Sequence, residues 1–165
     1  MCWLRRDLRL GDLPALGEAI GDGNREVLVC FVLDPRLESS SGERRLAFLY
    51  DSLREIDAKL DGKLLVVRGR PDEEIPRLVD AVGAGSVHVS EDFSPFGRRR
   101  DDAVAAALEE SGTTWQPVGS PYLVSPGRVT KSDGTPYKVF TPFFRAWRDH
   151  GWRAPAKTEA PSNIL

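Results

Sequence analysis

The sequence predicts a three-layer α/β fold, in which helices cover both faces of a parallel sheet of five strands. Short apolar runs typical of strands recur along the chain, and amphipathic helical patterns lie between them. Such alternation is typical of right-handed βαβ units on a parallel sheet. A central strand of this sheet is covered on both faces, and residues 27–33 (VLVCFVL) are accordingly apolar without alternation.

The first half of the chain predicts three strands and two helices. The strands are residues 2–4, 27–33 and 63–68. Asp12 is a candidate N-cap for a first helix that carries Pro14 in its first turn, and residues 21–24 predict the turn to the next strand. A stripe of apolar residues from 46 to 60 predicts the second helix, and Ser40 and Glu43 have the spacing of a capping box before it.

The second half predicts two further strand and helix pairs. The strands are residues 86–90 and, more weakly, 114–118. Apolar residues from 75 to 82 predict one helix, with Asp72 as its candidate N-cap. Ser94, followed by Pro95, is the candidate N-cap of the other helix, and Gly112 is its stop signal.

After residue 118 the pattern loosens into turn signals, which predict an extended connection over the surface. A last short helix is predicted from Thr141, with Pro142 at its first position and an apolar face that includes Phe144 and Trp147. This face either packs into the core of the domain or forms a docking surface for a second domain. Residues 151–165 have the composition of a linker, which suggests that the chain is part of a longer protein.

Composition limits the classes of function. A length of 165 residues fits one domain, and a net charge of −2 provides no overall field for attracting a polyanion. Cys2 and Cys30 each fall in a strand pattern, which favours reduced core thiols over a disulfide. No apolar run reaches the length of a membrane span, so we expect a soluble, cytoplasmic protein without membrane partners.

The common catalytic and phosphate-binding motifs are absent from the sequence. There is no GxGxxG, no GxxxxGK[ST] and no GxSxG. His88 and His150 have no companions at metal-ligand spacing and are interpreted as structural or surface residues. The Arg98–Arg100 run is interpreted as a solvated helix face rather than an anion site.

Charged residues follow several of the predicted strands. Ligands of an open parallel sheet bind beyond the carboxyl ends of its strands, near the point where the strand order reverses. The residues at that edge are Arg5, Arg6 and Asp7 after the first strand, Asp34 after the second, Gly69 and Arg70 after the third, and Glu91 and Asp92 after the fourth. The sequence therefore predicts a binding site at this edge.

Three segments resemble a known family. WLRRDLRLGDLPAL (3–16), EDFSPFGRRRD (91–101) and YKVFTPFFRAW (137–147) are similar, in order and spacing, to motifs of the N-terminal domain of the DNA photolyase and cryptochrome family. The resemblance implies a Rossmann-like, three-layer αβα antenna domain over residues 1–150 and the start of an interdomain linker over 151–165.

The resemblance also implies a function and partners. The family's helical domain, which holds FAD and binds UV-damaged DNA, is not in this chain. In photolyases the antenna passes energy to reduced FAD, which splits cyclobutane pyrimidine dimers, so the full protein is expected to be a deoxyribodipyrimidine photo-lyase. The chain alone should be inactive, and the N-terminal domain docks onto the helical domain. A cryptochrome blue-light receptor domain and a stand-alone nucleotide-binding or interaction module are the alternatives.

The resemblance places the antenna chromophore at the predicted edge. Residues matching the family's pocket for 8-hydroxy-5-deazaflavin are Arg6, Phe31, Asp34, Arg45 and Asp92. Methenyltetrahydrofolate and FMN are the other antenna candidates. Arg6 and Arg45 would face an anionic, phenolate-like end of the deazaflavin, and Ser94 stands where some relatives carry an acidic residue.

Overall fold

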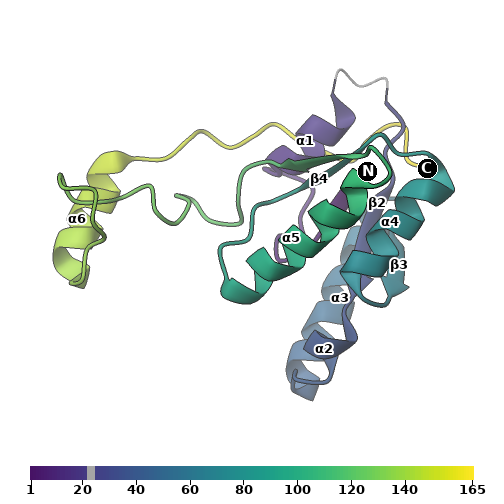
Figure 1. The fold of residues 1–165 in the computed structure, drawn as a ribbon, viewed down its shortest axis with the longest axis horizontal. Helices are drawn as coiled ribbons and strands as arrows, with labels where there is room; N and C mark the ends of the chain where they lie inside the picture. Colours follow the sequence, from purple (N-terminus) through teal and green to yellow (C-terminus); the bar gives the residue numbers. More distant parts are fainter. Residues whose placement is uncertain (22–24) are drawn as a thin grey trace.

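A computed structural model describes residues 1–21 and 25–165. The strands are β1 (Cys2–Leu4), β2 (Val29–Leu33), β3 (Leu65–Arg68), β4 (Ser86–Val89) and β5 (Thr114–Pro117). The helices are α1 (Pro14–Ile20), α2 (Pro35–Glu38), α3 (Glu43–Lys59), α4 (Pro71–Val82), α5 (Pro95–Glu109) and α6 (Phe140–His150). All five strands are parallel, in the order β3-β2-β1-β4-β5. Figure 1 labels β2, β3 and β4 among the helices of the domain. The predicted fold class is confirmed.

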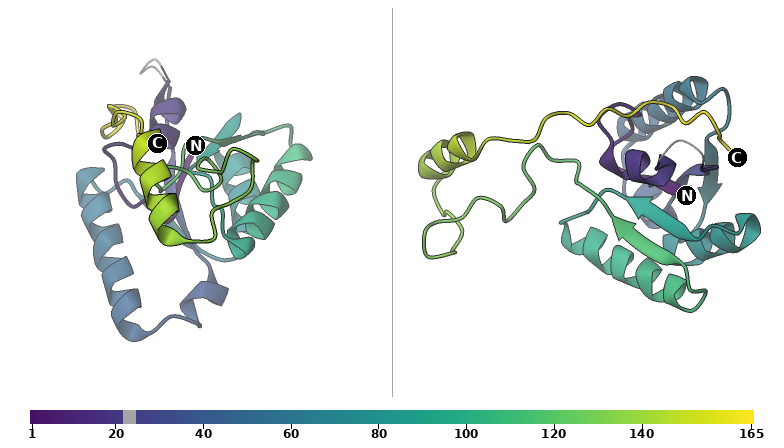
Figure 2. Two further views of the ribbon diagram at one scale, coloured as in Figure 1. Left: turned by 90° about the vertical axis from the view of Figure 1, so that its left-hand side faces the viewer. Right: turned by 90° about the horizontal axis from the view of Figure 1, so that it is seen from above.

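Alternate residues of the central strands supply two separate hydrophobic cores. Cys2 and Leu4 of β1 pack in the core beneath α1 and α3, whereas Trp3 packs in the core beneath α4 and α5. The same alternation divides Phe31 from Cys30 in β2. Because successive side chains of a strand point to opposite faces, an apolar run in the middle of the sheet fills both cores. Figure 2 shows the resulting layers of helices on either side of the sheet.

The helix caps differ from prediction at three of four positions. Ser94 caps α5 as predicted, because its side chain accepts a hydrogen bond from Gly97 N. The capping box is wrong, since Gly42 is the N-cap of α3 and the Ser40 hydroxyl donates to carbonyl groups of α2. Asp72 lies inside the first turn of α4, whose N-cap is Arg70.

Asp12 also does not cap a helix, because the chain turns at this residue. Its φ of 53° is in the left-handed region, and Leu13 takes the N-cap position of α1 without a side-chain hydrogen bond. The Asp12 carboxylate instead accepts hydrogen bonds from Ala156 N at 2.8 Å and Arg153 Nη1 at 2.6 Å. This aspartate therefore holds the C-terminal segment and not the helix.

The C-terminal segment returns along the α/β domain. The Thr158 hydroxyl accepts a hydrogen bond from Leu13 N and donates one to Leu10 O. Further on, Val27 and Ile164 form a parallel bridge. Residues 153–165 thus follow the surface of the domain, and the prediction that this segment begins a linker stays a prediction.

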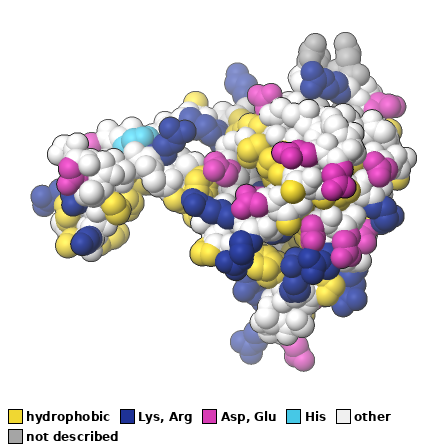
Figure 3. Space-filling view, in the orientation of Figure 1, with side chains coloured by type: hydrophobic (Ala, Val, Ile, Leu, Met, Phe, Trp, Pro, Cys, Tyr) yellow, Lys and Arg dark blue, Asp and Glu magenta, His cyan; other side chains and the backbone are white. Residues whose placement is uncertain are grey.

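Helix α6 projects from the domain on an extended connection (Figures 1 and 2). It begins at Phe140, one residue before the predicted start, and contains no buried residue. The alternative in which its apolar face packs into the core of this domain is therefore wrong. Phe140, Phe144, Trp147 and Trp152 stack in succession with ring centroids 5.4–6.2 Å apart. Figure 3 shows hydrophobic side chains exposed on this projecting lobe.

Other predicted features fall partly outside the described residues or within the core. The predicted turn at 21–24 lies outside them except for Gly21, which has a φ of 59°. Cys2 and Cys30 are buried and unbonded to each other, and burial raises the pKa of the Cys30 thiol to about 12. None of the helices in the described part of the chain has the length and apolar character needed to span a membrane.

Candidate functional site

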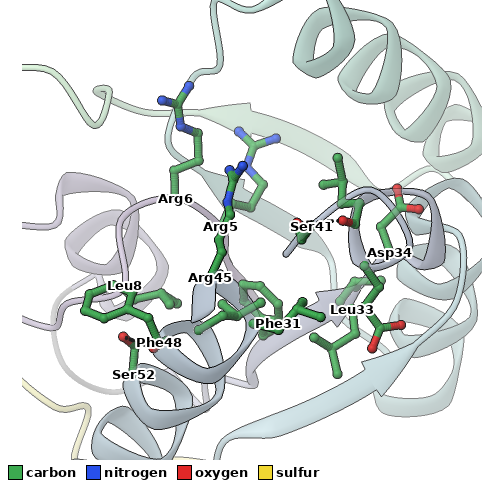
Figure 4. A pocket seen from close by; sticks show the side chains of 15 residues that line it. Arg5, Arg6, Leu8, Phe31, Leu33, Asp34, Ser41, Arg45, Phe48 and Ser52 are labelled. Carbon is green, nitrogen blue, oxygen red and sulfur yellow. Dashed lines mark hydrogen bonds between the residues drawn. The ribbon is translucent and has the colours of Figure 1, made fainter. Parts of the chain in front are cut away.

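An open cavity lies at the carboxyl ends of β1 and β2, between these strands and the first half of α3 (Figure 4). Its volume of about 260 Å³ is close to the lower end of the ~300–1,000 Å³ range of small-molecule sites. Its walls are formed by Arg5, Arg6, Leu8, Phe31, Val32, Leu33, Asp34, Leu37, Glu38, Ser41, Arg45, Leu46, Phe48, Leu49 and Ser52. Four of the five predicted site residues line it, and Asp92 does not.

The elements around the cavity bring together residues that are distant in the sequence. Phe31 is a buried residue of β2, and Figure 4 shows it between Phe48 at one end of the cavity and Asp34 at the other. Arg45 comes from the first turn of α3, where it was predicted. Because α3 packs over β2 through Leu53 and Ile56, its first turns form one wall of the cavity. The site therefore combines a flat apolar surface with cationic side chains.

A smaller cavity of about 110 Å³ adjoins the first. The residues common to both are Arg5, Arg6, Phe31, Val32, Asp34 and Leu37. Trp3, Pro71 and Arg100 extend the lining toward the point between β1 and β4. This is where the strand order reverses, the usual place for a ligand in an open parallel sheet.

Asp34 combines a structural role with its place on the cavity wall. Its side chain accepts from Arg36 N at 3.0 Å and so caps the short helix α2, which sequence analysis did not predict. The Arg36 guanidinium also reaches both carboxylate oxygens, at 2.6–3.1 Å. Burial raises the pKa of Asp34, but the hydrogen bonds and charge of Arg36 outweigh it, so the pKa lies below its usual value. Asp34 is therefore ionised, and the positive charge of Arg36 balances its negative charge.

Arg6 and Arg45 contribute positive charge to the cavity. Arg6 Nη1 lies 3.3 Å from Tyr122 Oη and 3.9 Å from Asp92 Oδ1, and 54% of the Arg6 side chain is exposed. Within the described residues, no carboxylate lies within 4.0 Å of Arg45. Arginine side chains that have no close carboxylate partner can form charged hydrogen bonds with an anionic ligand.

Beside the cavity, a buried charge network joins β1 to α5. Arg5 donates to the Asp101 carboxylate and to Ser90 O, and Arg100 Nη2 lies 2.8 Å from Asp101 Oδ1 and 3.3 Å from Asp92 Oδ2. The Arg5 and Arg100 guanidinium carbons lie 4.9 and 5.3 Å from the centroid of Trp3. Arg5, one of the charged residues that follow the first strand, therefore links that strand to α5 and to the end of β4.

This network corrects the interpretation of the Arg98–Arg100 run. Arg98 and Arg99 are exposed, but only 8% of the Arg100 side chain is accessible because it turns into the network. Asp92 lies against the start of α5, where it accepts from Ser94 N, and it approaches the cavity only through Arg6. A side chain at position 97 would collide with the Asp92 carboxylate, because a Cβ there would lie 2.2 Å from Asp92 Cγ. Asp92 is thus fixed within the network.

Sequence analysis missed several residues of the cavity wall. Phe48 lies outside the apolar stripe of α3 and is 75% exposed, so a large aromatic residue off the core face was the available signal. Leu8 and Ser41 lie in loops whose path no periodic pattern reveals. Only the packing of these loops against α3 shows that they line the cavity.

The histidines occupy separate environments. His88 is buried in β4, and its Nε2 lies 2.9 Å from Ser86 Oγ, whereas His150 is exposed at the end of α6. Across residues 1–21 and 25–165, no group of three or more His, Cys, Asp or Glu side chains is arranged to hold a metal ion. The interpretation of His88 as a structural residue agrees with these contacts.

Comparison with known proteins identifies relatives over nearly the whole chain. A family model described as DNA photolyase matches residues 1–162. The deoxyribodipyrimidine photo-lyase of Synechococcus sp. is 33% identical over 161 residues, which cover 94% of this chain and 33% of that protein. That of Streptomyces griseus is 34% identical over 169 residues, which cover 96% and 37%. Cryptochrome-2 of Gallus gallus is 36% identical over 137 residues, which cover 80% and 23%.

Solved structures agree with these relatives. A bacterial class III photolyase from Agrobacterium tumefaciens superposes with a TM-score of 0.82 and 28% identity, covering 97% of this chain and 33% of that one. An archaeal photolyase from Sulfolobus tokodaii, whose structure holds two FAD molecules, gives a TM-score of 0.83 and 25% identity, covering 99% and 38%. The chain spans about a third of the length of these photolyases.

Proposed function

This chain belongs to the DNA photolyase family, and we propose on that premise that it is the antenna-chromophore domain of a light-driven DNA repair enzyme. The full protein would split cyclobutane pyrimidine dimers by electron transfer from reduced FAD held in a helical domain beyond the antenna domain. Residues 1–150 would form the antenna domain and 151–165 the start of the linker. The chain alone would bind the antenna without repairing DNA. A cytoplasmic location is part of this proposal, supported by two unpaired, buried cysteines.

The observation that carries this proposal is the cavity at the ends of β1 and β2. Its floor contains the aromatic ring of Phe31, and Arg6 and Arg45 contribute positive charge that the protein does not fully pair. These features suit a flat, fused-ring chromophore with an anionic group. 8-Hydroxy-5-deazaflavin fits this description best. When bound, an antenna chromophore absorbs light and passes its energy to the FAD.

Each predicted site residue has a proposed role toward the chromophore. Phe31 packs against the ring system, and Arg45 and Arg6 bind its anionic end. Asp34 lines the wall next to Arg36 and accepts hydrogen bonds from the ligand's polar groups. Asp92 acts through Arg6, whose guanidinium it helps to hold at 3.9 Å. Methenyltetrahydrofolate and FMN remain the alternative ligands, since both also combine a ring system with negative charge.

The experiment that tests this function measures chromophore binding to the chain. We expect 8-hydroxy-5-deazariboflavin to bind with a shifted visible spectrum and with quenching of tryptophan fluorescence, because Trp3 lines the adjoining cavity. FMN and methenyltetrahydrofolate are titrated in the same way. Absence of binding by all three, with the chain shown by circular dichroism to be folded, would contradict the antenna proposal.

Helix α6 is proposed to dock onto the helical domain of the full protein. The proposal is supported by its exposed stacked aromatic rings and by the share of the matched photolyases, about two thirds, that this chain does not span. Phe140 and Phe144 are 72% and 44% exposed, so the chain alone should self-associate through them. Sedimentation analysis should show that the double variant Phe140→Ser, Phe144→Ser is monomeric at concentrations where the original chain is not. Equal self-association of both would argue against this surface.

A cryptochrome receptor shares this domain and remains the alternative for the full protein. Among the sequence relatives, Cryptochrome-2 of Gallus gallus matches 80% of the chain, whereas the photo-lyases of Synechococcus and Streptomyces match 94–96%. Light-dependent splitting of dimer-containing DNA by the full protein separates the two functions, because only the repair enzyme would lower the dimer content.

A further inference from the structure

The two acidic residues on the cavity wall are each paired with an arginine that does not line the cavity. Asp34 is held by Arg36, whose Nη2 lies 2.6 Å from Asp34 Oδ2. Glu38 is held by Arg68 at 2.7 Å and also accepts a hydrogen bond from the Tyr50 hydroxyl at 2.8 Å. The negative charge of the wall is therefore neutralised from outside.

The basic residues of the wall are less fully paired. Arg5 is committed to Asp101 and Ser90, but Arg6 has its nearest carboxylate at 3.9 Å. Arg45 has none within 4.0 Å in the part of the chain that the structure describes. Inside the cavity the balance of charge is consequently positive.

Arg36 is the residue on which this balance depends most directly. The Asp34 side chain is only 3% exposed, so solvent does little to screen its charge, whereas Arg36 is 42% exposed on the outer side. The Arg36 guanidinium also lies 5.4 Å from the centroid of the Phe96 ring, which limits its movement. Without Arg36, a buried carboxylate on the wall would keep an unmatched negative charge and would repel an anionic ligand.

We propose that Arg36 is a specificity-determining residue of the antenna cavity, which makes the site select the anionic form of a ring ligand by neutralising Asp34 from outside. This inference rests on the proposed antenna function and adds the charge state of the ligand and the residue that sets it. Arg36 does not line the cavity and acts through Asp34, so it is a positioning residue.

The test compares two probes that differ in one ionisable group. 8-Hydroxy-5-deazariboflavin is used above the pKa of its hydroxyl, and 5-deazariboflavin lacks that hydroxyl. We expect Arg36→Gln to weaken binding of the anionic probe by about tenfold, as loss of one nearby charge in a partly buried site predicts. Binding of the neutral probe should change by less than about twofold, because its contacts are apolar.

Three further variants isolate the effect of charge. Arg44→Gln is the matched control, because it also replaces an exposed arginine by glutamine, but in α3 and outside the cavity. It should leave the affinities for both probes unchanged. Arg36→Lys should restore most of the preference for the anion. The double variant Asp34→Asn, Arg36→Gln should also restore it, because no unmatched carboxylate remains.

A spectroscopic readout separates this role from a purely structural one. The visible spectrum reports ionisation of the bound hydroxyl, and its pKa should lie below that of the free probe in the original chain. In Arg36→Gln it should move back toward the free value. An unchanged bound pKa and an unchanged preference would overturn the inference while leaving the antenna function intact, whereas failure of the original chain to bind either probe would contradict that function itself.

Discussion

Two groups of charged side chains follow the strands of this sheet, and they differ in how completely the protein pairs them. In the network of Arg5, Arg100, Asp92 and Asp101, the four side chains are 6–14% exposed and bound to one another. On the cavity wall, Arg6 is 54% exposed with only a distant carboxylate, and Arg45 is exposed too. Arginines of similar sequence context are therefore buried and paired in one group but open to solvent in the other, and we propose that the open ones bind the ligand.

The largest expected effect is a loss of stability when one side chain of the buried charge network is removed. Asp101→Ala leaves the buried Arg5 and Arg100 without their shared carboxylate, and breaking a buried pair in this way costs about 3–5 kcal/mol of unfolding free energy. Urea unfolding measures this loss. The neighbouring Asp102→Ala, at an exposed position, should cost less than about 0.5 kcal/mol. Similar costs for both would mean that the network adds little stability.

A substitution on the cavity wall should instead weaken ligand binding and leave the stability of the fold nearly unchanged. Arg45→Gln should weaken binding of the anionic deazaflavin by about 10–100-fold, the worth of a charged hydrogen bond, with a change of less than about 0.5 kcal/mol in unfolding free energy. Titration and urea unfolding of the same sample measure the two quantities. The matched control Arg44→Gln should change neither. A large loss of stability with unchanged affinity would place Arg45 with the structural group.

Asp34 has features of both groups, because it is buried and paired with Arg36 but also lines the cavity. The pH dependence of the unfolding free energy measures what its ionised form contributes to stability. Its pKa is lower in the folded than in the unfolded chain, so its contribution is present above the unfolded value of about 3.9 and is lost as pH falls through the folded value. Asp34→Asn should therefore be less stable than the original chain near neutral pH, and the difference should shrink below about pH 4. Urea unfolding across this range is the measurement, and a constant difference would exclude ionisation as its source.

The sequence predicted residues that line one cavity better than it predicted the local structure around that cavity. Arg6, Phe31, Asp34 and Arg45 line one cavity, although Arg45 is separated by 39 positions from Arg6 in the printed sequence. The family resemblance supplied Arg45, whereas strand ends alone indicated Arg6 and Asp34. The short helix α2 and its Arg36 were missed, because four residues are too few to show a helical period.

Sequence by itself determined the order of the five strands and of the helices other than α2, the burial of β2 on both faces, and the Ser94 cap, because period and local hydrogen bonding fix these features. Only the tertiary structure decided which charges are paired. Asp12 holds residues 153 and 156, and Arg100 turns inward to Asp92 and Asp101. Such partners depend on how distant segments pack, and an aspartate or arginine carries no local signal of the group that it will meet.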